Sequence, residues 1–232
     1  MQPRIAVIIP ALNEEATLPS VLADISREVV EEVVVVDNGS SDRTAAVARM
    51  NDATVLHEPR RGYGAACLAG IAYLEQKAPD IVVFLDGDYS DCPEELPMVV
   101  RPIVSGAYDL VIGSRTKGLA APGALLPQAQ FGNALATLLI RLLYGFSYSD
   151  LGPFRAIRFS SLLALGMVDQ NYGWTVEMQI KAVRKGLRIT EVPVRYRKRS
   201  GGASKVTGTV KGTFLAGYKI LWTVFRYAGR IA

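Results

Sequence analysis

The sequence has few of the residues that build the commonest metal centres. It contains one histidine, His57, and two cysteines, Cys67 and Cys92. The spacing of the two cysteines fits neither a zinc site nor a disulfide framework, and it predicts reduced thiols in a cytoplasmic protein. A single histidine likewise excludes a metal centre built from imidazole ligands.

Long apolar runs and a large charge excess are also missing. No apolar run reaches the roughly 18–20 residues that cross a bilayer, because Lys211 and Lys219 interrupt the C-terminal stretch. Pro10 cuts the first apolar run short, so we expect no signal peptide. The net charge is only +4, with the basic residues concentrated at 195–199. This mild excess does not indicate a nucleic-acid-binding surface.

What the chain does have is material for a core. Half of its 232 residues are hydrophobic and 21% are charged, which suits one large α/β domain or two small ones. Continuous apolar strands alternate with helical segments, and this pattern predicts a doubly wound, mainly parallel sheet with helices on both faces. The expected strands are 5–9, 32–36, 54–56, 81–85, 110–113 and 189–195. The expected helices are 18–29, 42–50, 65–77, 93–104, 131–144 and 176–185.

Polar residues follow each of the first five expected strands. They lie at 10–14, 37–42, 60–64, 86–88 and 114–115. In doubly wound sheets, ligands bind outside the carboxyl ends of the strands, near the point where the strand order reverses. Acids, arginines and glycines at that edge are the residue types that a sugar nucleotide with a metal ion would need.

The most informative of these segments is Asp86-Gly87-Asp88. Two carboxylates, one residue apart and just past a buried strand, suit Mg²⁺ or Mn²⁺, which prefer oxygen ligands and often share their site with substrate phosphates. The alternative is a solvated turn, because Asp-Gly is a common turn pair.

Several motifs, taken in order, carry a family resemblance. Residues 8–15, 36–44 and 86–88 resemble glycosyltransferase family 2. Residues 150–157, 173–178 and 201–205 resemble its polyprenyl- or dolichyl-phosphate hexosyltransferase branch. The resemblance covers nearly the whole chain, and it implies a single GT-A domain over residues 1–208, followed by an amphipathic helix over 209–232.

The resemblance also implies roles for individual residues. It places Pro10, Leu12 and Glu14 against the nucleoside, and Asp37 at the base or ribose. Asp86 and Asp88 would hold the Mg²⁺ or Mn²⁺ ion that bridges the donor diphosphate. Arg61 would lie near the donor, and Arg115 and Lys205 would contact its phosphates.

The chain departs from the family pattern on the acceptor side. Relatives carry an arginine thought to meet the acceptor phosphate, and the match here is Gln130. This departure either weakens the case for a phosphate acceptor or moves the role to Arg155, Arg195 or Arg199.

The expected reaction is inverting transfer of a hexosyl group from a nucleoside-diphosphate sugar to a polyprenyl phosphate. Such a phosphate is mostly dianionic at neutral pH and needs no base. A saccharide or small-molecule hydroxyl, the alternative acceptor, would need a nearby carboxylate. Asp91, Asp150 and Glu177 are the candidates, although Asp150 could instead fix its own loop.

The final helix has two readings. Phe214, Tyr218, Leu221, Trp222 and Phe225 share one face, and Lys211, Lys219, Arg226 and Arg230 lie near it. This pattern is typical of a helix on an anionic membrane surface, at the cytoplasmic face. The same face could instead pack on the core or in a homo-oligomer, and the sequence leaves the oligomeric state open.

Two other functions fit the sequence less well. A non-catalytic nucleotide-sugar-binding partner would not need the intact set Asp37, Asp86, Asp88 and Arg115. A nucleotidyltransferase would carry a glycine-rich basic loop after its first strand, where this chain has acidic residues and no glycine.

Overall fold

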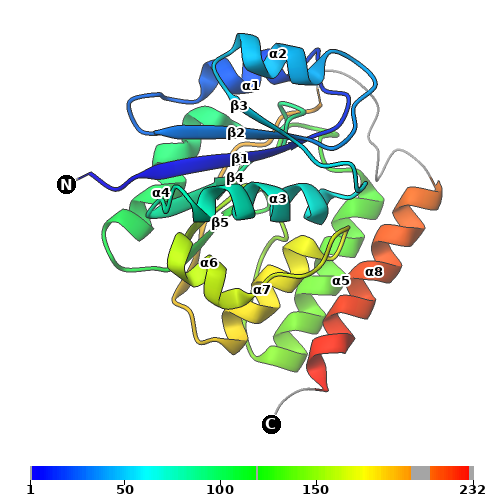
Figure 1. The fold of residues 1–232 in the computed structure, drawn as a ribbon. Helices are drawn as coiled ribbons and strands as arrows, with labels where there is room; N and C mark the ends of the chain where they lie inside the picture. Colours follow the sequence, from blue (N-terminus) through cyan, green and yellow to red (C-terminus); the bar gives the residue numbers. More distant parts are fainter. Residues whose placement is uncertain (1, 119, 200–209, 230–232) are drawn as a thin grey trace.

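The computed structural model describes residues 2–118, 120–199 and 210–229. Its centre is a seven-stranded sheet in the order β3-β2-β1-β4-β6-β5-β7 (Figure 1). The strands are β1 (Ile5–Ala11), β2 (Glu32–Asp37), β3 (Thr54–His57), β4 (Ile81–Phe84), β5 (Leu110–Ser114), β6 (Arg155–Arg158) and β7 (Ile189–Pro193). The helices are α1 (Leu18–Asp24), α2 (Thr44–Met50), α3 (Tyr63–Glu75), α4 (Leu96–Val104), α5 (Pro127–Tyr144), α6 (Phe159–Leu165), α7 (Trp174–Arg184) and α8 (Val210–Ala228), with a short 3₁₀ turn at Pro93–Glu95.

Helices cover both faces of the sheet because the strands are buried on both sides. Alternate residues of β1 show this directly: Ala6 and Ile8 belong to one hydrophobic cluster, and Val7 and Ile9 to the other. The first cluster contains side chains of α3, α5, α6, α7 and α8, and the second contains those of α1, α2 and α4. The doubly wound, mainly parallel class is confirmed.

One strand was missed. β6 runs antiparallel between β4 and β5, so the loops after β4 and β5 are two strand spacings apart, about 10 Å. Its sequence, Arg-Ala-Ile-Arg, lacks the continuous apolar run that marks the other central strands. Arg155 nevertheless lies fully buried inside the sheet.

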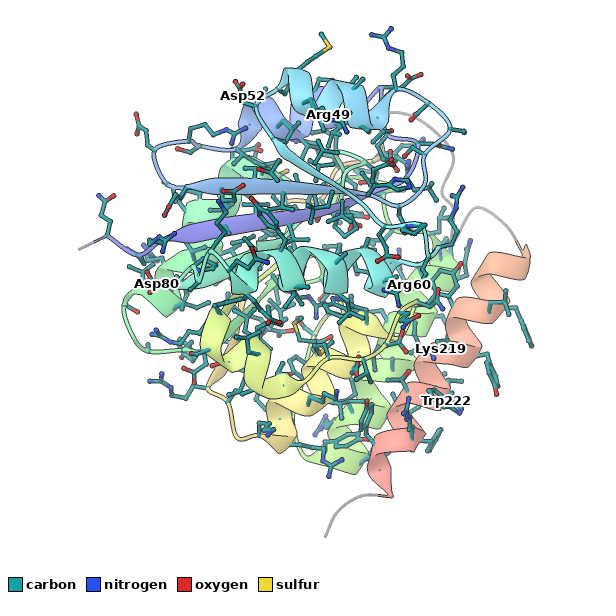
Figure 2. All side chains as sticks on the ribbon, in the orientation of Figure 1. Arg49, Asp52, Arg60, Asp80, Lys219 and Trp222 are labelled. Atoms are coloured by element: carbon teal, nitrogen blue, oxygen red, sulfur yellow. The ribbon has the colours of Figure 1, made fainter. Side chains whose placement is uncertain are left out.

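The order of the strands creates a crevice. From β1 the chain proceeds outward to β2 and β3, and β4 then returns to the other side of β1. The loops that follow β1 and β4 therefore diverge at the carboxyl edge of the sheet, where ligands bind in this class of fold. Asp80, just before β4, and Arg60, after β3, lie at opposite ends of the sheet (Figure 2).

Several helix boundaries differ from the expected ones, most of all the end of α1 and the start of α5. α1 ends at Asp24, well before the expected end at 29, and α5 begins at Pro127, a residue type suited to a first helical turn. α8 lies beside α5 and packs on it through Val224, whose carbonyl accepts a 2.5 Å hydrogen bond from the Tyr144 hydroxyl (Figure 1). Over the described residues, none of the helices has the length and apolar character needed to cross a membrane.

A close helix–sheet contact gives a test of this packing. A Cβ added at Gly70 in α3 would lie 2.8 Å from Cγ2 of Ile8 in β1. We expect Gly70→Ala to lower the free energy of unfolding by about 1–3 kcal/mol through overpacking. The matched variant Gly132→Ala in α5, where an added Cβ meets nothing within 4 Å, should raise it by up to about 1 kcal/mol. Urea denaturation of both variants measures the difference, and equal effects would contradict this packing.

Candidate functional site

A cleft of about 560 Å³ lies at the carboxyl edge of the sheet. Its walls come from the loops that follow β1 to β5, from the segment before α7, and from Ala216 and Ile220 on the inner face of α8. Eight residues expected to form the site line it: Pro10, Leu12, Glu14, Arg61, Asp86, Asp88, Arg115 and Arg199.

The other expected residues lie elsewhere. Gln130 and Asp150 line a second cavity, described below. Among the described residues, Asp37, Arg155 and Glu177 line neither cavity. Lys205 and Arg230 fall outside the described residues, as does the side chain of Lys211.

Three carboxylates crowd the loop after β4. Burial, followed by the charges of Asp91 and Asp88, raises the pKa of Asp86 well above its usual range. Burial and the charge of Asp88 raise the pKa of Asp91 to about 7. One buried oxygen of Asp86 and one of Asp91 have no hydrogen-bond partner in the part of the chain that the structure describes. Because unpaired buried carboxylates are costly, this loop favours a cation.

The donor set fits a metal ion that is shared with substrate. No group of three or more His, Cys, Asp or Glu side chains within the described ranges is arranged to hold a metal. Asp86 and Asp88 can supply two carboxylates, and the unpaired oxygen of Asp86 is available as a ligand. Mg²⁺ is commonly bound by one or two carboxylates together with substrate phosphates.

Asp88 and Glu14 face each other across the cleft through an arginine. Arg199 donates to Oδ2 of Asp88 at 3.0 Å and to Oε1 of Glu14 at 2.5 Å. Glu14 comes from the loop after β1 and Asp88 from the loop after β4, so this contact spans the crevice between the two strands.

Arg115 is held in place by Asp150. Its backbone N and its Nε each donate to Oδ2 of Asp150 at 2.8 Å, and its NH2 group donates to Oδ1 at 2.7 Å. The ring of Tyr196 lies 5.0 Å from the guanidinium carbon. Because both oxygens of the buried Asp150 accept from Arg115, the geometry favours Asp150 as a positioning residue rather than a base.

Arg155, expected on the acceptor side, makes its hydrogen bonds with backbone groups. Its side chain is fully buried and donates to the carbonyl oxygens of Leu151, Gly152 and Thr175. Burial lowers the pKa of this arginine. Arg155 thus ties the turn at 151–152 to the start of α7, out of reach of a substrate.

Glu177, expected to be catalytic, is likewise surrounded by protein groups. The carboxylate is fully buried and accepts from the backbone N of Asp169 at 2.7 Å, from the hydroxyl of Tyr227 at 2.7 Å, and from Lys181 at 2.7 Å. An acid on an apolar helix needs a partner. Here the partners lie in the segment before α7, in α7 itself and in α8, and none of them is a substrate group. Glu177 therefore braces these elements.

The second strand end contains one expected residue and one that was missed. Oδ1 of Asp37 accepts from the backbone N of Ser40 at 2.9 Å, and Oδ2 lies 3.3 Å from Nδ1 of His57. Burial alone would raise the pKa of Asp37, but the hydrogen bonds from Ser40 and His57 outweigh it and lower the pKa. Its contact with a base or ribose remains a prediction.

Asn38, beside it, lines the cleft. Its amide donates to the carbonyls of Glu58 and Arg60 and accepts from the backbone N of Gly62. The sequence placed Asn38 in the polar segment 37–42 but did not single it out, because its partners lie 20 to 24 residues away.

The segment before α7 fits closely against the loop after β3. A Cβ at Gly62 would lie 2.1 Å from the carbonyl oxygen of Gln170, and one at Gly64 would lie 2.0 Å from that of Asp169. Asp169 in turn pairs with Lys219 of α8 at 3.0 Å. α8 therefore contributes more to the cleft than the two side chains that line it. Through Lys219 and Asp169 it is also linked to the part of the wall that follows β3.

A second cavity of about 540 Å³ adjoins the cleft and shares Arg115 with it. Gln130 lies on its rim and donates to the carbonyl oxygen of Leu125 at 2.8 Å. The remaining lining combines hydroxyl, amide and guanidinium groups with apolar side chains: Thr116, Leu125, Ala129, Asn133, Ala134, Thr137, Leu138, Arg141, Ser147, Tyr148, Ser149 and Asp150.

Comparison with known proteins gives a consistent result. The family model described as glycosyl transferase family 2 matches residues 6–166. An uncharacterized glycosyltransferase of Mycobacterium tuberculosis is 39% identical over 91% of this chain and 94% of its own length. The undecaprenyl-phosphate mannosyltransferase of Micrococcus luteus is 32% identical over 90% of each chain. The dolichyl-phosphate hexose transferase of Haloferax volcanii is 35% identical over 85% of this chain and 84% of its own.

A solved structure shares the fold. Glucosyl-3-phosphoglycerate synthase of Mycobacterium tuberculosis, crystallised with Mn²⁺, UDP and glucosyl-3-phosphoglycerate, superposes with a TM-score of 0.79 at 25% identity, covering 98% of this chain and 80% of that one. The same enzyme has also been crystallised with Mg²⁺ and UDP. The sheet and helices described above are therefore those of a GT-A-like glycosyltransferase fold.

The bracing role of Glu177 is testable. Glu177→Ala leaves Lys181 and two backbone amides without their buried partner, and we expect it to lower the free energy of unfolding by about 3–5 kcal/mol. Folded enzyme at low temperature should keep its kcat and show only a raised KM for donor, because the segment before α7 loosens. Glu75→Ala, exposed on α3, is the control. A large loss of kcat at unchanged stability would restore a catalytic role to Glu177.

Proposed function

Because the chain belongs to glycosyltransferase family 2, we propose that it is a metal-dependent, inverting enzyme that transfers a hexosyl group from a nucleoside-diphosphate sugar to a polyprenyl phosphate. The observation that carries this proposal is the cleft at the crevice between β1 and β4, where Asp86, Asp88, Arg115 and Arg199 converge. The undecaprenyl-, dolichyl- and polyprenol-phosphate enzymes among the relatives support the acceptor class.

The donor would lie along the cleft. Pro10 and Leu12 offer an apolar wall for the nucleoside, with Arg61 nearby. Contact of Asp37 with the base or ribose stays a prediction. Asp86 and Asp88 would hold Mg²⁺ or Mn²⁺, which when bound neutralises charge on the leaving diphosphate. Arg115, fixed by Asp150, presents a preorganised positive charge to the same phosphates, so little reorganisation is needed as the bond breaks. Lys205 remains a prediction for the same role.

The second cavity is the proposed acceptor site. It meets the donor cleft at Arg115, and Gln130, Asn133 and Arg141 can donate hydrogen bonds to a phosphate there. A phosphate dianion attacks without a base. Of the three candidate bases, Asp150 is committed to Arg115, and Asp91 and Glu177 line neither cavity. The absence of a suitably placed base among these three carboxylates favours a phosphate over a hydroxyl as the acceptor.

A lipid acceptor also needs a bilayer, and two neighbouring helices offer a surface for it. The exposed apolar residues of α5 and α8 are Phe131, Leu138, Leu142, Phe214, Leu215, Tyr218, Trp222 and Phe225. Lys219 and Arg226 stack on the ring of Trp222, and Figure 2 shows Lys219 and Trp222 on α8. Aromatic side chains among cations suit the interface of an anionic membrane. We place this contact at the cytoplasmic face, where Cys67 and Cys92 would stay reduced.

A small-molecule acceptor is the second candidate. Gln130 replaces an arginine expected for a phosphate acceptor, and the similar solved structure contains glucosyl-3-phosphoglycerate, a small soluble product. The two candidates differ in whether turnover requires a lipid phosphate.

The metal role is tested by an isosteric substitution. We expect Asp88→Asn to reduce nucleoside-diphosphate release by at least about 10²-fold, because a ligand carboxylate is lost. Excess chelator should abolish release by the unmodified enzyme, and Mn²⁺ or Mg²⁺ should restore it. Asp80→Asn, at the opposite end of the sheet, is the control (Figure 2). Full activity of Asp88→Asn, or activity in chelator, contradicts the metal assignment.

The membrane contact is tested with vesicles. Tyr218→Glu combined with Phe225→Glu places two negative charges on the exposed face of α8, and should weaken flotation with phosphatidylglycerol vesicles at least tenfold. Met50→Glu, on α2 beside the labelled Arg49 and Asp52 at the far end of the molecule, should have no effect (Figure 2). Equal flotation of all three proteins would rule out α8 as the membrane-binding surface.

A further inference from the structure

Arg199 forms an ion pair with Asp88, one of the two carboxylates that a metal ion would need. One of its amino groups donates to Oδ2 of Asp88 at 3.0 Å, and the other donates to Oε1 of Glu14 at 2.5 Å. The arginine side chain is only 20% exposed, and the two acid side chains are less exposed still, at 15% for Asp88 and 8% for Glu14. These are partly desolvated, charge-assisted hydrogen bonds, which are stronger than surface ion pairs.

The hydrogen bonds of Asp88 show which partner can leave. Oδ1 accepts from the backbone N of Ser90 at 3.0 Å and from its hydroxyl at 2.5 Å, which are contacts within one turn of the chain. Oδ2 accepts from Arg199, which is 111 positions away in the sequence and reaches Asp88 with a long side chain. A cation that binds Oδ2 must displace the guanidinium, whereas the Ser90 contacts can stay.

We propose that Arg199 is a placeholder cation, which neutralises Asp88 and Glu14 and is displaced when a divalent metal ion and the donor diphosphate bind together. The inference rests on the proposed function, because it assumes a diphosphate donor. It assigns Arg199 to the order of binding on the donor side, in place of the acceptor contact expected from the sequence.

Charge explains why metal and diphosphate should bind together. A guanidinium and a divalent cation cannot share Oδ2 of Asp88, since like charges at that distance repel strongly. Metal alone therefore has to break the contact between Arg199 and Oδ2 of Asp88. A diphosphate that arrives with the metal gives the displaced guanidinium a new anionic partner, so each ligand should raise the affinity for the other by the same factor.

Glu14 keeps its place through this exchange. Its second oxygen, Oε2, accepts from the hydroxyl of Thr17 at 3.1 Å, and the same hydroxyl contacts the carbonyl of Gly87 at 2.8 Å. The loops after β1 and β4 are thus joined independently of Arg199, and removing the arginine should leave the cleft in shape.

The neighbouring arginines do not compete for this role. Arg195 pairs with Glu94 and Glu95, and Arg197 pairs with Glu94 and stacks on Tyr89. Arg195→Gln therefore removes the same charge from the same segment without touching Asp88, and it is the matched control for Arg199→Gln.

The test measures Mn²⁺ binding by electron paramagnetic resonance, without nucleotide and then with saturating UDP or GDP. We expect Arg199→Gln to bind Mn²⁺ alone about tenfold more tightly than the unmodified protein, and to lose most of the enhancement by nucleotide. Arg195→Gln should behave like the unmodified protein, and Arg199→Lys should lie between. Unchanged or weaker Mn²⁺ binding by Arg199→Gln overturns the proposal.

The unmodified protein provides a second, independent reading. The proposal requires its Mn²⁺ affinity to rise when the nucleoside diphosphate is present, and equal affinity with and without nucleotide contradicts it even if Arg199→Gln does not fold. Failure of the proposed function has a different signature: no sugar nucleotide would be turned over, whatever the Mn²⁺ affinity of the variants.

Discussion

The structure depends on a concentration of negative charge at one edge of the sheet. Asp86, Asp88 and Asp91 lie within the seven residues after β4, and Glu14 approaches them from the loop after β1. Burial and mutual repulsion make this cluster unfavourable unless cations stay close. The positions of Arg115 and Arg199 meet that requirement, and so would the proposed metal ion.

Buried charged residues outside this cluster make the site rigid. Asp150 holds Arg115, Arg155 ties the turn at 151–152 to α7, and Glu177 joins the segment before α7 to α8. Each of these three side chains is fully buried and hydrogen-bonded, and removing one partner from such a group is costly. The carboxyl edge of the sheet can therefore hold several buried carboxylates close together, because the elements that support it are fixed.

The sequence predicted the elements whose signal is local. Apolar runs identified six of the seven strands, and the polar residues that follow them predicted most of the cleft lining. The sequence does not show which side chains meet partners that are distant along the chain. Arg155 and Glu177 were expected to be functional because a charged residue in apolar surroundings needs a partner. Only the fold shows that their partners are backbone groups and other helices. β6 was missed because two arginines interrupt its short apolar pattern, and Asn38 because its partners belong to another loop.

We propose above that the protein transfers a hexosyl group, bound in this cleft, to a lipid phosphate. The most direct measurement is release of nucleoside diphosphate from a panel of sugar nucleotides with Mn²⁺ or Mg²⁺, with and without a short polyprenyl phosphate. If the acceptor is a lipid phosphate, release requires that lipid phosphate and stops with chelator. Release that is independent of the lipid phosphate, or that proceeds only with a hydroxyl acceptor, would contradict it.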